Sequence, residues 1–192
     1  MRTRIRRALP GLALLALGAC APTDYYLLPP PAPAAARTTG LSMSVADVSL
    51  PAYAEALEIA ATDPASGAVR LSKDALWADT PRRALTRHLV AALQTRLGGT
   101  IASEPWPGFD SPDRRLEVIV DRMIGAPDGP LSFEGQYILV TSDGRIAASQ
   151  RFAITVPSQG PGYPGLLADH ARAIEILADQ IAARVSGRRT GA

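Results

Sequence analysis

The sequence predicts an α+β fold, with a mostly antiparallel sheet and two amphipathic helices packed on it in a single domain. Apolar residues recur at helical spacing in two segments, residues 81–97 and 167–185. Three consecutive segments between them, residues 115–124, 131–141 and 145–156, have the length and composition of strands. Long strands in succession between two helices favour a sheet covered by helices, so these observations together predict the fold class.

The first 19 residues predict a secretory signal. Four arginines open the chain, an apolar run follows from Leu9 to Leu17, and small residues close the segment. The run is too short to cross a bilayer, which needs about 20 apolar residues. The arginines are Arg2, Arg4, Arg6 and Arg7.

Cys20 is the only cysteine of the 192 residues, and it ends the sequence LGAC. This sequence resembles a lipobox, at which bacterial lipoproteins are cut just before a cysteine that then carries acyl chains. An exported protein with one cysteine has no partner for an intramolecular disulfide. We therefore predict lipidation at Cys20. An ordinary cleaved signal with an incidental cysteine and an uncleaved anchor are the alternatives.

The residue after the cysteine bears on the location. Ala21 stands where an aspartate would resemble an inner-membrane retention signal of Gram-negative lipoproteins. Its identity therefore favours lipid anchoring at the periplasmic face of the outer membrane.

Removal of the signal changes the charge of the protein. The whole chain has a net charge of +2 and a pI of about 9.0. The mature part keeps 16 of the 20 basic residues and all 18 acidic residues, which gives a net charge of −2. Because no basic stripe remains, binding to nucleic acid is not expected.

Residues 20–40 are expected to form a lipidated cysteine and a tether rich in proline and alanine. An extended polyproline segment of this length would reach about 60 Å. Tyr25 and Tyr26 lie within it. They are expected either to join the domain as an edge strand or to contact a partner, and the sequence leaves both alternatives open.

The folded domain is expected to span residues 41–187, with a disordered tail at 188–192. Its first strand begins at residue 41, shifts its phase at Val48 as a bulge would, and ends at Pro51. A short helical turn at residues 53–57 and two brief strands at 57–62 and 68–72 are expected next. Trp77 is expected to pack where the following helix begins.

The first long helix is predicted over residues 81–97. Thr80 suits the N-cap, Pro81 suits the first helical position, and Gly98 ends the helix. Leucines form the apolar face, and the arginines are expected largely on the opposite side. These arginines are Arg82, Arg83, Arg87 and Arg96.

The three strands that follow are predicted to form an antiparallel meander. The Asp143-Gly144 pair suits a tight hairpin because both residues tolerate a positive φ. In the third strand, alternate residues are expected to face the core. These residues are Ile146, Ala148, Gln150, Phe152, Ile154 and Val156.

A loop rich in proline and glycine, residues 157–165, is expected to lead into the last helix, which Gly187 ends. Gln159 and Tyr163 of this loop are candidate partner contacts, and a plain connector is the alternative.

Sequence motifs of catalysis are missing from the chain. It contains no nucleophile elbow, no zinc-binding H-E-x-x-H and no phosphate-binding P-loop. His88 and His170 are expected to be helix residues rather than metal ligands, and neither is expected to be needed for function. Asp110 and Asp113 are expected in a solvated turn. We therefore expect no enzyme, no cofactor and no metal site.

The order of several short motifs resembles a known family. After the lipobox come YYLLP at 25–29, VADVSLPAY at 45–53 and LWADTPRRAL at 76–85, followed by the helix, the meander and the C-terminal helix. This arrangement is similar to that of the PqiC-like ABC-type transport auxiliary lipoproteins. The resemblance covers nearly the whole mature chain and includes no catalytic motif.

The resemblance implies a function and partners. The family assists MCE-type systems that move lipids or other apolar molecules across the periplasm and maintain membrane integrity. The implied partners are an MCE-domain tunnel protein and an inner-membrane ABC transporter, and the implied assembly is a homo-oligomeric ring. Contacts with a partner are expected from Tyr25, Tyr26, Gln159 and Tyr163. A structural lipoprotein that braces an envelope complex without a transport role is the alternative.

Overall fold

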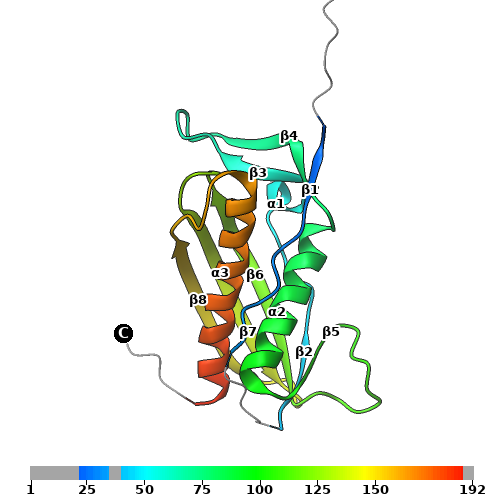
Figure 1. Ribbon diagram of the computed structural model, residues 1–192. Helices are drawn as coiled ribbons and strands as arrows, with labels where there is room; N and C mark the ends of the chain where they lie inside the picture. Colours follow the sequence, from blue (N-terminus) through cyan, green and yellow to red (C-terminus); the bar gives the residue numbers. More distant parts are fainter. Residues whose placement is uncertain (1–21, 35–39, 188–192) are drawn as a thin grey trace, which may run out of the picture.

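A five-stranded sheet is the largest element of the protein, whose computed structural model describes residues 22–34 and 40–187 (Figure 1). Its strands lie in the order β5-β2-β6-β7-β8. Their bounds in that order are Thr100–Ser103, Ser42–Val45, Arg114–Gly125, Leu131–Thr141 and Ile146–Val156.

The strands β6, β7 and β8 form the predicted antiparallel meander. The hairpin between β7 and β8 turns at Gly144, whose φ is 82°. Strand β2 instead pairs in parallel with both β5 and β6. A parallel neighbour requires a long crossover connection, and the segment from β2 to β5 supplies one because it contains a complete helix.

A second, three-stranded sheet in the order β1-β4-β3 lies at one end of the molecule (Figure 1). Strands β3, Glu58–Thr62, and β4, Val69–Trp77, form a hairpin. Both brief strands predicted here are therefore present, and the second one is longer than expected. The edge strand β1 is Asp24–Tyr26, and the short helix α1, Ala52–Glu55, precedes β3.

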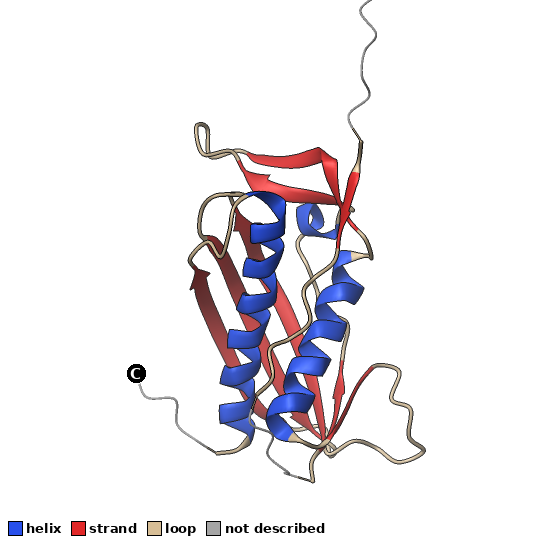
Figure 2. Cartoon of the chain, viewed as in Figure 1, coloured by secondary structure: helices blue, strands red, loops and turns tan. Residues whose placement is uncertain are grey.

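Two long helices, α2 and α3, lie side by side on one face of the five-stranded sheet (Figure 2). Helix α2 is Pro81–Leu97 and α3 is Gly162–Val185. Their apolar faces pack on inward side chains of the sheet, which confirms the α+β class. Buried core residues include Leu85, Leu89, Leu93 and Leu97 of α2, Leu167, Ile174, Leu177 and Ile181 of α3, and Leu116, Val118, Phe133, Leu139 and Phe152 of the sheet.

Helix α2 has the bounds that its sequence predicts. Thr80 occupies the N-cap position and Pro81 is the first helical residue, but the Thr80 side chain makes no capping hydrogen bond. The helix ends at Gly98, which has a left-handed φ of 64°. Arg96 was expected on the solvent side of α2, and this expectation is wrong because its side chain is buried.

Helix α3 begins earlier than predicted. It starts at Gly162, inside the segment expected to be a loop, so Tyr163 belongs to its first turn. Proline does not prevent this start, because the first helical turn needs no intrahelical N–H donor. Gly165 is tightly packed against Gly160, where a Cβ would collide with the backbone of Gly160.

Two of the β8 residues that were expected to face the core are exposed, Ile146 and Gln150, although Ala148, Phe152, Ile154 and Val156 are buried as predicted. Gln150 keeps the predicted face, because its Oε1 accepts a 2.9 Å hydrogen bond from the hydroxyl of the buried Tyr137. The register between β7 and β8 shifts after the pair Leu139 and Ala148, so that Ile146 pairs with Val140. A bulge of this kind inserts one residue and changes the face on which the next side chain lies.

Gly135 of β7 provides a test of this packing. A Cβ on Gly135 would overlap the Ile119 carbonyl oxygen and lie 2.9 Å from the Phe152 ring. We expect Gly135→Ala to lower the free energy of unfolding by about 2 kcal/mol or more. Urea denaturation of the domain measures the change.

Gly160→Ala is the matched control, because a Cβ at Gly160 meets only an ordinary contact at 3.7 Å. Equal stability of the two variants would contradict the close approach of β6, β7 and β8 at Gly135.

Candidate functional site

The segment 22–34, which we call the strap, crosses the helical face of the domain (Figure 1, blue). Its strand β1 pairs in parallel with β4, with Asp24 opposite Ala75 and Tyr26 opposite Trp77. The strap then passes α2, where residues 27–31 and four α2 residues line a shared hollow of about 270 Å³. These four residues are Ala84, Arg87, His88 and Ala91.

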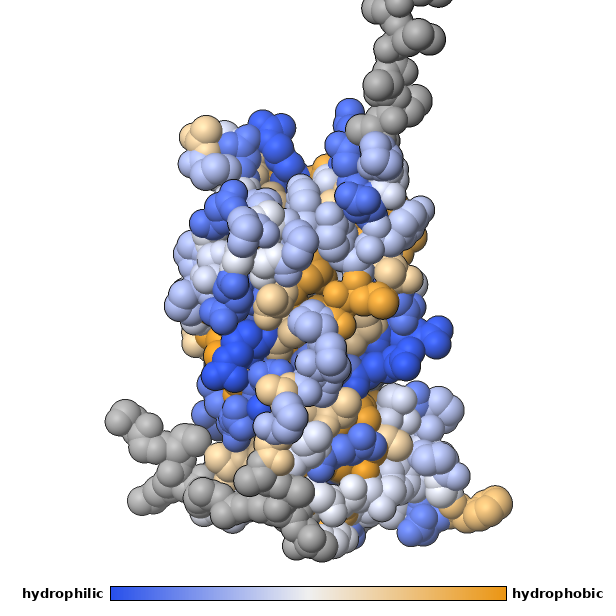
Figure 3. Space-filling view, in the orientation of Figure 1, coloured by the Kyte–Doolittle hydropathy of each residue, from blue (hydrophilic) through white to orange (hydrophobic). Residues whose placement is uncertain are grey.

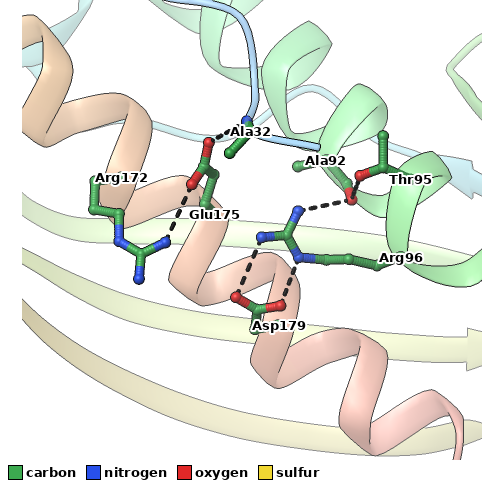
Figure 4. A network of polar contacts seen from close by, with 7 residues as sticks. All are labelled: Ala32, Ala92, Thr95, Arg96, Arg172, Glu175 and Asp179. Atoms are coloured by element: carbon green, nitrogen blue, oxygen red, sulfur yellow. Dashed lines mark hydrogen bonds and ion pairs between the residues drawn. The ribbon is translucent and has the colours of Figure 1, made fainter. Parts of the chain in front are cut away.

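A polar network fastens the strap to the helices (Figure 4). The Ala32 N–H donates a 2.7 Å hydrogen bond to Oε1 of Glu175 in α3. The other carboxylate oxygen of Glu175 accepts from Arg172 at 3.2 Å. Glu175 is buried, and a buried carboxylate needs such donors because burial without them is costly.

The two helices are joined by an ion pair in the same region (Figure 4). Arg96 of α2 donates from Nε and Nη2 to the two carboxylate oxygens of Asp179 in α3, at 2.7 and 3.2 Å. Its Nη1 donates to the carbonyl oxygen of Ala92 at 3.1 Å. Arg96 is buried and Asp179 is exposed. The buried guanidinium therefore has acceptors on both helices.

This geometry changes the expected reach of residues 20–40. The strap is docked from Asp24 onward by strand pairing and by the bond from Ala32 to Glu175. Residues 24–32 are therefore not part of an extended 60 Å tether in this structure. Of the two alternatives for Tyr25 and Tyr26, the structure shows the edge strand.

The candidate contact residues Tyr26 and Tyr163 are brought together. Their ring centroids are 6.2 Å apart at an interplanar angle of 40°, so the strap packs on the first turn of α3. Gln159 donates its backbone N–H to Asp169 at 2.8 Å and its side-chain amide to the carbonyl oxygen of Pro157 at 2.9 Å. The Tyr25 side chain is 66% exposed. Contact of these residues with a partner stays a prediction.

Trp77 is buried, as predicted, at the end of β4. Its indole meets the His170 ring edge-on, with centroids 5.5 Å apart. The Nδ1 atom of His170 lies 2.6 Å from the Leu166 carbonyl oxygen, and since a carbonyl only accepts, Nδ1 carries the hydrogen. Burial lowers the pKa of His170 to about 4. His170 is therefore a neutral core residue at neutral pH.

His88 is also buried, and burial lowers its pKa. Its Nε2 atom has no hydrogen-bond partner among the residues that the structure describes. Within the same residues, no group of three or more histidine, cysteine, aspartate or glutamate side chains could hold a metal ion. Cys20 lies outside the described residues.

Asp113 is exposed, as expected for a solvated turn, but it also holds two strands in place. Its Oδ2 accepts hydrogen bonds of 2.8 Å from the backbone N–H and the hydroxyl of Ser42, at the start of β2. The same hydrogen bonds lower the pKa of Asp113. Asp110 is exposed in the loop between β5 and β6.

Sequence reasoning missed Arg96 and Glu175. One signal was available, because both residues adjoin the apolar stripes of their helices, next to Leu97 and Ile174. Arg96 and its partner Asp179 are 83 positions apart in the chain. Glu175 and its partner Ala32 are 143 positions apart. Such distant pairs leave no local pattern.

Comparison with known proteins identifies relatives of the fold. A family model described as the ABC-type transport auxiliary lipoprotein component matches residues 25–182. A crystal structure of an uncharacterized protein is 24% identical with a TM-score of 0.72, and the match covers 85% of this chain and 99% of that one.

A Xanthomonas campestris protein assigned to the DUF330 family is 18% identical with a TM-score of 0.65. This match covers 85% of this chain and 96% of the relative. Among curated proteins, none matches the chain.

The strap is expected to loosen when its acceptor is removed. In Glu175→Ala the Ala32 N–H loses a bond of about 1 kcal/mol, so its hydrogen exchange should become about fivefold faster. Asp179→Ala is the control, because Asp179 binds Arg96 and not the strap. Unchanged exchange at Ala32 in Glu175→Ala would contradict the role of Glu175.

His170 should make the stability of the domain depend on pH. Its pKa falls from 6.5 when exposed to about 4 in the fold, so the unfolded chain binds more protons between these values. The resulting stability is complete above pH 6.5 and is lost as the pH falls toward 4.

Between pH 7 and pH 5, we expect the wild type to lose about 2 kcal/mol more than His170→Gln in urea denaturation. Equal losses in the two proteins would show that His170 takes up its proton in the folded domain.

Proposed function

The chain belongs to the family of ABC-type transport auxiliary lipoprotein components, and from this premise we propose that it is a non-catalytic, lipid-anchored part of an ABC transport system. The match over residues 25–182 carries the proposal, because it covers nearly all of both sheets and both long helices. The proposed anchor is Cys20, and the proposed location is the periplasmic face of the outer membrane.

Anchoring at Cys20 is supported by the signal-like segment 1–19 and by the sequence LGAC. Both lie outside the described residues. Among residues 22–34 and 40–187, no helix is both long and apolar enough to cross a bilayer. Stable anchoring needs more than one acyl chain, and lipoprotein processing supplies several.

The proposed partner is an MCE-domain tunnel protein that leads to an inner-membrane ABC transporter. The motif order that resembles the PqiC-like lipoproteins supports this choice. Anchoring confines the domain to one membrane surface, which raises its effective concentration for a weakly binding partner. The domain would then join the periplasmic tunnel to the outer membrane while lipids or other apolar molecules pass.

Lipidation is tested by mass spectrometry of the mature protein. We expect the chain to begin at Cys20 and to carry acyl chains, and we expect Cys20→Ala to leave the membrane fraction after a salt wash. An unmodified Cys20, or a Cys20→Ala protein that stays bound to the membrane, would refute the anchor.

The partner is tested by crosslinking in cells. Photoreactive residues placed singly at exposed positions of the described surface, among them Tyr25 at 66% exposure, should capture the MCE-domain protein from at least one position. A photoreactive residue at the buried Trp77 is the control and should capture no other protein. Crosslinks only to cell-wall components, together with normal resistance to membrane-active compounds in cells without the protein, would favour the bracing alternative.

A further inference from the structure

We propose that the loop of residues 104–113, between β5 and β6, is the surface with which this domain binds its protein partner. The loop would insert Phe109 into an apolar pocket of the partner, beside a lysine or arginine. This inference rests on the proposed function, because the lipid anchor at Cys20 decides which end of the domain faces the membrane.

The loop and the anchored end of the chain lie at opposite ends of the molecule. In Figure 1, β1 is at the end that carries the three-stranded sheet, and the loop between β5 and β6 is at the other end. Helix α3 runs between these ends, and its 24 residues span about 36 Å. The two ends are therefore separated by several tens of ångströms.

The chain before β1 is too short to bridge this distance. Four peptide steps separate Cys20 from Asp24, and fully extended they reach about 14 Å. Since β1 is bonded to β4, its end of the domain stays near an anchor at Cys20. The loop of residues 104–113 is thereby held on the side that faces away from the anchoring membrane.

The loop presents apolar side chains to solvent. Phe109 is fully exposed. The same loop also lines a hollow of about 420 Å³, whose apolar part is formed by Pro105, Trp106 and Pro112 of the loop and by Val140 of β7. Figure 3 shows an apolar projection at the lower right, where this loop leaves the domain. A loop that combines an exposed aromatic with a partly apolar hollow has the composition of an interface centre.

The charge beside Phe109 indicates the chemistry of the partner. Asp110 forms no hydrogen bond or ion pair with any residue that the structure describes. The neighbouring carboxylates are satisfied, since Glu104 binds Arg115 at 2.5 Å and Asp113 binds Ser42 at 2.8 Å. A lysine or arginine of the partner would form an ion pair with the Asp110 carboxylate. The same carboxylate would repel acidic surfaces, which favours the correct partner.

A bilayer is the less suitable occupant of this loop. Bacterial membrane surfaces that carry anionic lipids repel a free carboxylate, and Asp110 is adjacent to Phe109, the side chain of this loop that would insert. The position of the anchor also keeps the loop away from the membrane that holds Cys20. Both arguments favour a protein that lies in the periplasm.

The first experiment measures which end faces the membrane. An introduced cysteine can be labelled uniquely, because the only native cysteine would be acylated. Fluorescent labels at Phe109→Cys and Tyr25→Cys are compared in the lipidated protein, in phosphatidylethanolamine and phosphatidylglycerol vesicles with a headgroup quencher. We expect quenching at position 25 and none at 109. Quenching at 109 would overturn the proposal in favour of a membrane contact.

The second experiment measures binding of the purified periplasmic part of the MCE-domain protein to the same vesicles. We expect Phe109→Ser and Asp110→Lys each to weaken binding at least tenfold. Leu71→Ser is the matched control, because Leu71 is a half-exposed apolar residue of β4. The affinity of this variant for the partner should stay within twofold of that of the wild type.

The outcomes separate the two proposals. Wild-type affinity in both loop variants would overturn the docking loop and leave the proposed function standing. No binding by the wild type would overturn the proposed partner, and the docking loop would fall with it. A photoreactive residue placed at position 109 provides a further check. Crosslinking of this residue only to a second copy of the chain would also overturn the proposal.

Discussion

The docking of the strap onto the domain is the interaction on which the rest of the account depends. Strand β1 completes the three-stranded sheet, and the Ala32 N–H binds the buried Glu175 between the long helices. The chain therefore leaves the fold at a fixed place, next to β4. Without these contacts, residues 20–40 would be the long tether that their composition indicates, and an anchor at Cys20 would not orient the domain.

The polar groups of the interior stabilise the arrangement of strap and helices. His170 is a neutral core residue against Trp77, and Arg96 joins α2 to α3 through Asp179. Both carboxylate oxygens of Glu175 accept hydrogen bonds, one from the Ala32 N–H of the strap and one from Arg172. By contrast, Phe109 and Asp110 are exposed at the end of the molecule remote from β1. The interior therefore explains the shape of the domain, and its surface is where we expect function.

Local pattern predicted most of the secondary structure. Helix α2 and the meander have periodic apolar residues and turn residues such as Gly98 and Gly144, so their bounds followed from the sequence. The docked strap did not follow, because a proline-rich segment has no period and its partners are distant in the chain. The bulge that turns Ile146 outward is likewise set by pairing with β7. Tyr26 and Tyr163 were both singled out, but their mutual contact is tertiary.

Hydrogen–deuterium exchange of the lipidated protein in vesicles, with and without the MCE-domain partner, tests the central claim most directly. If the strap orients the domain, the β1 amides that bond to β4 and the amide of Ala32 stay protected in both states, and the loop of residues 104–113 gains protection when the partner binds. Exchange of the strap at the rate of an unfolded chain in the membrane-bound protein would contradict the account, because the domain would then be free to tilt on a long tether.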